Sequence, residues 1–311
     1  MTWDPLDLPA QSGTTFVVTG ANAGLGYFTS EQLAATGAHV VLACRNPVKA
    51  AAAVAAIRRR VPGASVSALT LDVADADSVR AAAALLLELP RLDGLVLNAG
   101  MVHPPRKRET SMAGNEIVLE TNYLGHFHLT ALALPALQRT AGSRVVALGS
   151  LATRLVASRL DNLQLVTGYS GWTAYAQSKI AMQVFGFELD RRLRRAGLGG
   201  PGGVQSLVAH PGYSVSGLTP GIRGVNEPSR AQRFADNLQG LIGAQGKDRG
   251  AWPTVRALID PDARGGEYYG PRFLTRGLPH RQRPTSTSLD PQVAAHLWSR
   301  TESLLGLPFP L

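Results

Sequence analysis

The chain has little cysteine and little lysine, and it lacks long apolar runs. Cys44 is the only cysteine among the 311 residues, so a disulfide within the chain is excluded. No Cys and His residues have the spacing of a metal site, so we expect no bound metal. No apolar run approaches the roughly 18 residues of a membrane span, and residues 1–9 lack the pattern of a signal peptide. These absences favour a cytoplasmic protein with no membrane span.

Positive charge exceeds negative charge, with 31 Lys and Arg against 22 Asp and Glu and a formal net charge of +9. Such a balance can attract nucleic acid, a membrane surface or a phosphorylated cofactor. The basic residues are scattered, and neither interleaved aromatic residues nor a nucleic-acid motif accompanies them. We therefore expect no nucleic-acid partner.

Short β-branched and apolar runs alternate with helical segments along most of the chain. Parallel strands joined by helices form an open sheet that helices cover on both faces. The sequence therefore predicts an α/β fold of the Rossmann type, doubly wound around a mostly parallel sheet of seven strands. The expected strands are residues 14–19, 39–44, 66–71, 92–97, 144–148, 205–209 and 265–269, and the longest expected helices are residues 116–138 and 172–195. The first of these helices is expected to be interrupted near Pro135.

No internal repeat or low-complexity linker divides the chain, so residues 1–311 are predicted to form one domain with a core over about residues 14–270. An insertion over residues 213–250, at the carboxyl end of the sheet, could form a substrate lid. The other predicted segments are an irregular, partly pocket-lining connection over residues 151–171, a C-terminal extension over residues 271–311, an exposed stretch near residues 281–286 and a final helix over residues 291–305.

A glycine-rich turn joins the first predicted strand to the first helix. Gly20, Gly24 and Gly26 have the spacing G-x3-G-x-G, a variant of the dinucleotide fingerprint. Glycines at such a turn let backbone N–H groups approach a pyrophosphate at the positive end of the helix. Asn22 and Leu25 lie within the turn, and we include them in the predicted cofactor site.

The second strand ends in Arg45 and Asn46, where an acidic residue would otherwise bind a ribose 2′-hydroxyl. An arginine at this place suits a 2′-phosphate, whose oxygens a guanidinium can bind. The sequence therefore favours NADP(H) over NAD(H), with Arg45 and Asn46 as cofactor-binding residues.

Two further strands end in polar or small residues. Asp72 and Val73 follow the third strand, and Asn98, Ala99 and Gly100 follow the fourth. Open α/β sheets bind ligands at the carboxyl ends of their strands, so these five residues are candidates for cofactor binding. Two structural alternatives stay open, a helix cap for Asp72 and a turn former for Asn98.

Tyr175 and Lys179 lie four residues apart and therefore share one face of the long helix. A free tyrosine has a pKa of roughly 10, and a neighbouring ammonium favours the phenolate and lowers that pKa. A tyrosine tuned in this way can exchange a proton with a carbonyl or alcohol oxygen. Ser150 ends the fifth strand without the G-x-S-x-G pattern of a hydrolase, so a hydrogen bond to a substrate oxygen is its expected role.

Asn122 lies inside the helix predicted over residues 116–138, where asparagine is slightly unfavourable. Its side chain should therefore either face solvent or have a buried polar role. His126 and His128 follow, and we interpret both as packing or surface residues. Pro211 and Gly212 form the turn after the sixth strand.

Together these residues resemble the short-chain dehydrogenase/reductase family over residues 14 to about 270. The narrower resemblance is to the retinol dehydrogenase and protochlorophyllide reductase-like branch, through the Ala-Cys-Arg-Asn strand end, the His-Pro-Gly-Tyr turn and the Gly-Gly-Glu-Tyr-Tyr-Gly-Pro segment. The family motifs in their order are Thr19-Gly20-x3-Gly24-x-Gly26, Asp72, Asn98-Ala99-Gly100, Asn122, Ser150, Tyr175-x3-Lys179 and Pro211-Gly212.

The resemblance implies a role for each motif. Tyr175 is the acid/base, and Lys179 lowers its pKa and bonds the nicotinamide ribose. Ser150 holds the substrate oxygen, and Asn122 positions a water that links Lys179 to solvent. The implied cofactor contacts are the pyrophosphate for Gly20, Gly24 and Gly26, the adenine for Asp72, the adenine ribose for Asn98, and the nicotinamide for Pro211 and Gly212.

The expected function is NADP(H)-dependent hydride transfer to or from an alcohol or carbonyl of a lipophilic small molecule. The resemblance also implies a homodimer or homotetramer paired through the helices that bear Asn122 and Tyr175. One alternative is a nucleotide-sugar epimerase or dehydratase, which has a tighter glycine spacing and a larger C-terminal domain. Another is a catalytically silent, NADP-sensing or interaction protein, a class that usually lacks Tyr, Lys or Ser of the set.

Overall fold

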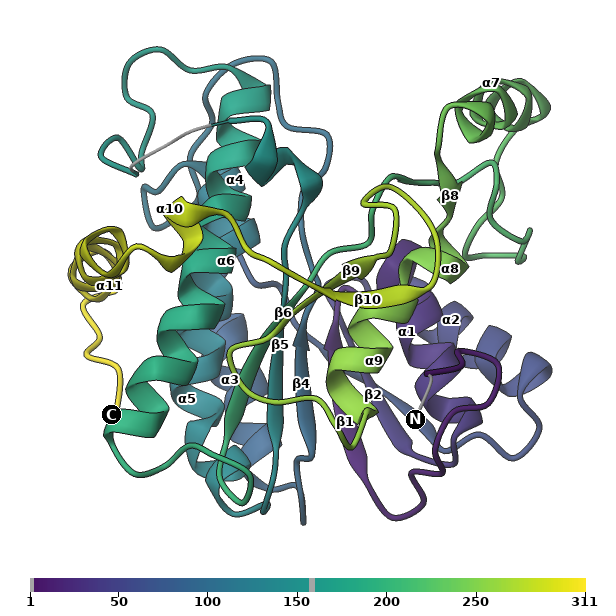
Figure 1. Ribbon diagram of the computed structural model, residues 1–311, viewed down its shortest axis with the longest axis horizontal. Helices are drawn as coiled ribbons and strands as arrows, with labels where there is room; N and C mark the ends of the chain where they lie inside the picture. Colours follow the sequence, from purple (N-terminus) through teal and green to yellow (C-terminus); the bar gives the residue numbers. More distant parts are fainter. Residues whose placement is uncertain (1–2, 157–159) are drawn as a thin grey trace.

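A computed structural model describes residues 3–156 and 160–311, which form an eight-stranded sheet between two layers of helices (Figure 1). The order across the sheet is β10-β9-β6-β5-β4-β1-β2-β3, and every neighbouring pair is parallel except β9 and β10. The strands are β1 (Thr15–Thr19), β2 (His39–Cys44), β3 (Val66–Thr70), β4 (Gly94–Leu97), β5 (Arg144–Leu148), β6 (Gln205–Ala209), β9 (Tyr268–Pro271) and β10 (Pro279–Gln282).

Each face of the sheet has its own hydrophobic core, because alternate residues of a strand point to opposite faces. In β1, Val17 joins one core while Phe16 and Val18 join the other. The first core is shared with α3 (Ala76–Leu87), α5 (Gly125–Gln138) and α6 (Gly171–Arg195), and the second with α1 (Gly24–Ala35), α2 (Pro47–Arg60) and α9 (Trp252–Ile259). This arrangement confirms the predicted doubly wound fold.

The helix predicted over residues 116–138 is interrupted, but not where the sequence indicated. It consists of α4 (Ile117–Leu119), a π-helical turn (Glu120–Leu124) and α5, with Pro135 inside α5. Both neighbours of Pro135, Leu134 and Ala136, are 1% exposed, so packing against the core holds the helix through the proline. The expected interruption at Pro135 is therefore wrong.

The C-terminal extension adds the strand that the sequence did not indicate. β10 pairs antiparallel with β9, and Gln282 of β10 accepts a hydrogen bond from His210 Nε2 at 3.0 Å. The stretch near residues 281–286 is thus exposed at Arg281 and Arg283 but packed at Gln282. Two helices follow, α10 (Ser286–Leu289) and α11 (Pro291–Leu305), and α11 packs against α6.

A small second sheet lies outside the main one, between β7 (Ser214–Val215) and β8 (Gln245–Gly246). It joins the two ends of the segment predicted as a lid, which contains α7 (Arg230–Leu241) and is followed by α8 (Lys247–Gly250). α7 stands away from the main sheet in Figure 1, and Asp236 is its only buried residue. The Oδ2 atom of Asp236 accepts a hydrogen bond from the Gly217 backbone at 2.6 Å.

Residues 157–159 of the connection over residues 151–171 lie outside the described residues. Its described part includes a short 3-10 helix, Leu151–Arg154, and three leucines that are at most 5% exposed, Leu160, Leu163 and Leu165. Over residues 3–156 and 160–311, none of the helices is both long enough and apolar enough to cross a membrane.

Candidate active site

Three of the predicted catalytic side chains meet at the carboxyl end of β5. Tyr175 and Lys179 are one turn apart on α6, whose N-terminus is capped by Ser170 through a 3.0 Å bond from the Thr173 N–H. The Tyr175 hydroxyl donates to Ser150 Oγ at 3.2 Å. Lys179 Nζ donates to the Leu148 carbonyl at 2.9 Å.

Asn122, the fourth predicted catalytic residue, is fully buried in the π-helical turn. Its Oδ1 accepts the Met101 N–H at 2.6 Å, and its Nδ2 donates to Ser178 Oγ at 2.9 Å. A Cβ added to Gly100 would lie 3.1 Å from Asn122 Oδ1 and 3.7 Å from Lys179 Nζ, so these groups are neighbours. The side chain therefore has the buried polar role that was one of its two alternatives.

Burial sets the electrostatics of the tyrosine and lysine. It raises the pKa of Tyr175 above its ordinary value, and the hydrogen bond with Ser150 acts in the opposite direction. Burial also lowers the pKa of Lys179 to about 8. The expected lowering of the Tyr175 pKa by Lys179 is not found in this structure, where burial has the largest effect and the ammonium is bonded to the Leu148 carbonyl.

In the glycine-rich turn, the backbones of neighbouring segments lie very close together. Gly20 has a φ of +65°, and a Cβ there would lie 2.8 Å from the Ala99 Cα. A Cβ at Gly26 would overlap the Asn98 amide and the Gly20 carbonyl. The N-cap residue of α1, Ala23, provides no side-chain hydrogen bond, so the first N–H groups of α1 are left for a ligand. This backbone fits the pyrophosphate that the sequence predicts.

The end of β2 presents an exposed guanidinium. Arg45 Nη1 lies 3.8 Å from Asp72 Oδ2, with the arginine side chain 77% exposed. Asp72 does not cap α3; Asp75 does, so that structural alternative for Asp72 is wrong. Asn46 Oδ1 accepts the Lys49 N–H at 3.0 Å and caps α2, which gives its side chain a structural role.

The turn after β6 is fixed by a buried histidine. His210 Nδ1 accepts the Gly212 N–H at 3.2 Å, so its Nε2 must carry the proton that is donated to Gln282. Burial lowers the pKa of His210 to about 4, which keeps the ring neutral. Gly212 has a φ of +69°, and a Cβ there would overlap the Thr275 carbonyl. The Pro211-Gly212 backbone is thus held at the same sheet edge as Tyr175.

The family model described as short chain dehydrogenase matches residues 14–222 of this chain. That range contains the glycine-rich turn and the Ser150, Tyr175 and Lys179 cluster. The chain is a short-chain dehydrogenase/reductase. It is an oxidoreductase of a family that uses NAD or NADP.

This short-chain dehydrogenase is similar to known proteins over almost its full length. It is 34% identical over 307 residues to retinol dehydrogenase 13 of Homo sapiens, covering 96% of this chain and 86% of the relative. It is 34% identical over 308 residues to polyprenol dehydrogenase of Mus musculus, covering 97% and 87%. A crystal structure from Mycobacterium paratuberculosis matches with a TM-score of 0.79 and 35% identity, covering 99% of each chain. These matches place the short-chain dehydrogenase in the retinol dehydrogenase branch.

Thr19 begins the first family motif but is not among the predicted site residues, and the structure shows it to be a polar residue of the site. Its Oγ1 accepts the N–H groups of Asn98 and Ala99, each at 2.9 Å, and lies 3.0 Å from His126 Nε2. His126 is fully buried, as the packing interpretation allowed, and burial lowers its pKa to about 3. Asn98 Nδ2 donates to the Thr19 carbonyl at 2.7 Å, so Asn98 is more than a turn former. Thr19 therefore joins the ends of β1 and β4.

The remaining predicted cofactor residues flank the turn. Asn22 and Leu25 are partly exposed, and a Cβ at Gly250 of α8 would lie 2.9 Å from Leu25 Cδ2. Val73 is buried, with its carbonyl directly against Gly125 of α5. Val73 thus has a structural role in packing against α5, and the side chain of Asn46 has one as the cap of α2.

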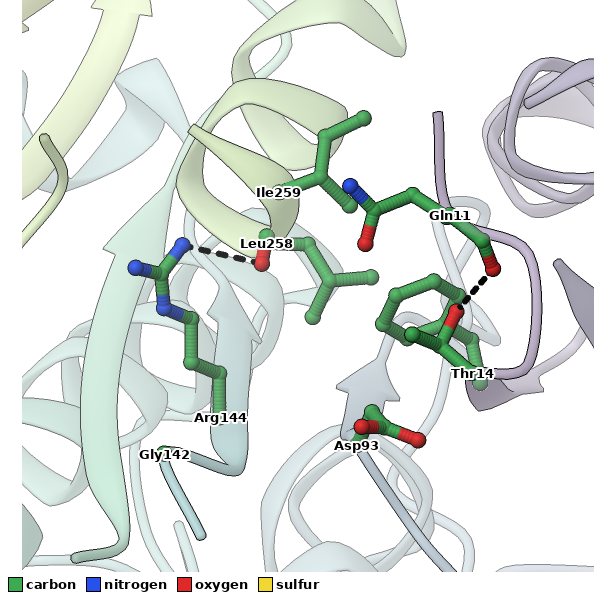
Figure 2. A pocket seen from close by; sticks show the side chains of 8 residues that line it. Gln11, Thr14, Asp93, Gly142, Arg144, Leu258 and Ile259 are labelled. Carbon is green, nitrogen blue, oxygen red and sulfur yellow. Dashed lines mark hydrogen bonds between the residues drawn. The ribbon is translucent and has the colours of Figure 1, made fainter. Parts of the chain in front are cut away.

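A hollow of about 170 Å³ lies at the other end of the strands, away from the candidate site. Figure 2 shows the side chains that line it. It lies at the amino ends of β1, β4 and β5, between Thr14, Asp93 and Arg144. Arg144 Nη1 donates to the Leu258 carbonyl at 2.9 Å and thereby binds the end of α9 to the sheet. Ligands of parallel sheets bind at the carboxyl ends of the strands, so this hollow is part of the scaffold.

Proposed function

We propose that this short-chain dehydrogenase transfers a hydride between NADP(H) and an alcohol or carbonyl of a lipophilic small molecule, with Tyr175 as the acid/base. The observation that carries the proposal is the 3.2 Å bond between Tyr175 and Ser150 beside the buried Lys179. Two hydroxyls that point at each other can also point together at one substrate oxygen. The full set of Ser, Tyr and Lys argues against a catalytically silent protein.

Bound nicotinamide would supply or accept the hydride. Tyr175 would move a proton to or from the substrate oxygen, and Ser150 would donate a second hydrogen bond to that oxygen. Lys179, with a pKa of about 8, can exchange a proton near neutral pH. The hydrogen bonds of Asn122 to Met101 and Ser178 would keep the segments next to Lys179 in position.

Arg45 supports NADP(H) over NAD(H). Its guanidinium ends β2, is largely exposed and has only the 3.8 Å pair with Asp72 among the described residues. A 2′-phosphate at this edge would replace a weak surface pair with charge-assisted hydrogen bonds. Gly20, Gly24 and Gly26 would hold the pyrophosphate, Asp72 the adenine, Asn98 the adenine ribose, and Pro211 and Gly212 the nicotinamide.

The relatives named for retinol and polyprenol support a lipophilic substrate. The lid proposed over residues 213–250 presents apolar side chains to solvent, including Phe234 at 70% and Leu241 at 80% exposure. Neither the described core nor the comparisons point to the sugar domain of an epimerase or dehydratase. We place the enzyme in the cytoplasm and treat residues 1–311 as one domain.

A homodimer or homotetramer stays a prediction, but α5 and α6 offer it little apolar surface. Residues 174–190 of α6 are buried within the single chain except for Tyr175. Trp298 of α11 and Phe309 pack edge-to-face against Phe127 of α5, with ring centroids 5.1 and 5.0 Å apart. An assembly of this chain would therefore use another face, and light scattering after size-exclusion chromatography measures whether one forms.

A screen of retinoid, polyprenol and aromatic alcohols and carbonyls, followed by NADPH absorbance, tests the proposed function. We expect turnover with at least one lipophilic compound and none when Tyr175 is replaced by Phe. Turnover that persists in Tyr175→Phe would contradict the assigned role, and NADPH binding without any turnover would favour the silent alternative.

A further inference from the structure

Lys247 is held over the glycine-rich turn by the base of the lid. It is the first residue of α8, and its backbone N–H donates to Thr219 Oγ1 at 2.8 Å. α8 packs against α1 (Figure 1). There, Gln32 Nε2 of α1 donates to the Asp248 carbonyl of α8 at 2.8 Å. Two segments more than 200 residues apart in sequence are thereby joined at the site.

The side chain of Lys247 reaches the start of α1. A Cβ added to Gly24, the first residue of α1, would lie 3.7 Å from both Cδ and Nζ of Lys247. In the described part of the chain, the ammonium makes no hydrogen bond and no ion pair within 4.0 Å. Asp236, the carboxylate that faces it from α7, already accepts the Gly217 N–H.

This arrangement places the ammonium of Lys247 beside the positive N-terminal end of α1. The N-terminus of a helix carries about half a positive charge from its free N–H groups, and α1 has no acidic residue in its first turn and no side-chain cap. A partly buried ammonium next to that end is unfavourable unless an anion joins them. Burial also lowers the pKa of Lys247, an effect that a bound anion would offset.

We propose that Lys247 is a ligand of the pyrophosphate of the bound dinucleotide, an inference that rests on the proposed function. The pyrophosphate is the anion that the adjacent glycine-rich turn fits. The 2′-phosphate belongs at the end of β2 with Arg45 and is not needed to explain Lys247. β8 and α8 also form the base of the lid. A cofactor bound to Lys247 would therefore keep the base of the lid in position.

The experiment is isothermal titration of purified full-length protein with NADPH, NADH, ADP-ribose and 2′-AMP. ADP-ribose has the pyrophosphate without the 2′-phosphate, and 2′-AMP has the 2′-phosphate without the pyrophosphate. Lys247→Met should weaken NADPH, NADH and ADP-ribose by a similar factor of about ten, the size of one charge-assisted contact. Its binding of 2′-AMP should stay within about twofold.

Two further variants control the result. Arg249→Met removes an exposed cation from the same turn of α8 and should leave all four affinities within about twofold. Lys247→Arg keeps the charge and should retain affinity for ADP-ribose within about fivefold. Thermal unfolding of each variant without nucleotide checks that the fold is kept.

Unchanged binding of ADP-ribose by Lys247→Met overturns the inference, and so does an equal loss for 2′-AMP. Failure of the nucleotide binding on which the proposed function depends looks different. In that case the wild-type protein binds none of the four nucleotides, whereas a wrong assignment of Lys247 leaves wild-type binding intact and the variant equal to it.

Discussion

The nucleotide half of the molecule, residues 14–100 from β1 to just beyond β4, is packed more tightly than the lid over residues 213–250. In the nucleotide half, β1 is buried at all five positions and β4 at all four, and backbone contacts at Gly20 and Gly26 leave no room for a Cβ. In the lid, α7 buries Asp236 alone, and Leu238, Leu241 and Ile242 are 53–80% exposed. The proposed cofactor site is thus built on a packed core, and the proposed substrate lid is a loosely packed appendage.

This difference separates the two parts of the proposed reaction. A cofactor that is always the same can be bound by a rigid surface, and its contacts are fixed by core packing. A substrate that must enter and leave needs a segment of low local stability. Lys247 and the β7–β8 pairing connect the two regions, so their separation is incomplete at the base of the lid.

The largest expected effect comes from truncating a leucine side chain in each of the two regions. Leu42 in β2 is fully buried, whereas Leu241 in α7 is 80% exposed. Leu42→Ala should lower the free energy of unfolding by about 3 kcal/mol, and Leu241→Ala should change it by less than about 0.5 kcal/mol. Urea denaturation measures both. Equal losses would show that the lid is packed as tightly as the core.

Ser150 tests whether chemistry can be lost without loss of cofactor binding. Ser150→Ala removes the proposed hydrogen bond to the substrate oxygen and should lower kcat/KM by about 10²-fold or more. Its Kd for NADPH should stay within about threefold of wild type. Thr153→Val is the matched control, because that buried hydroxyl is already bonded to the Ser150 carbonyl. If the control is as inactive as Ser150→Ala, the effect is structural.

Lys179 gives a prediction about pH. Its pKa is lowered to about 8 in the folded chain, so the unfolded chain binds the proton more tightly. The free energy of unfolding should therefore rise with pH between about 8 and 10.5. Relative to Lys179→Met, wild type should gain about 3 kcal/mol from pH 7 to pH 10.5. The Lys49→Met variant replaces an exposed lysine and keeps Lys179, so it should show the same rise as wild type. A difference between wild type and Lys179→Met that is constant with pH contradicts the burial effect.

Replacing Arg45 has the smallest expected effect and tests the preference of the nucleotide half for NADPH over NADH. Arg45→Ala should weaken NADPH by about tenfold, the size of one lost charge-assisted contact, and NADH by less than about twofold. Arg59→Ala, on the exposed last turn of α2, is the control. Equal losses for NADPH and NADH would contradict the NADP(H) preference.

Much of the nucleotide half could be predicted because its signals are local. β2 and β6 have the predicted bounds, since each is a short apolar run between turn residues. Tyr175 and Lys179 fall on one helix face by spacing alone, and β5 ends just before Ser150 as expected.

The rest depends on contacts between distant segments. The π-helical turn at Asn122 is held by bonds to Met101 and Ser178, 21 and 56 residues away, which no local pattern encodes. β10 begins with a proline and exposes His280 and Arg281, so it lacks the alternation of a strand. The approach of Lys247 to Gly24 likewise requires the lid to fold back on α1.

The central claim is that Tyr175 performs proton transfer at a cofactor site that the nucleotide half builds without it. The most direct measurement is kcat/KM and the NADPH Kd of Tyr175→Phe on one preparation. The account predicts a loss of at least about 10³-fold in kcat/KM with a Kd within about twofold of wild type. A variant that keeps a tenth of its activity, or that loses NADPH binding and activity together, contradicts it.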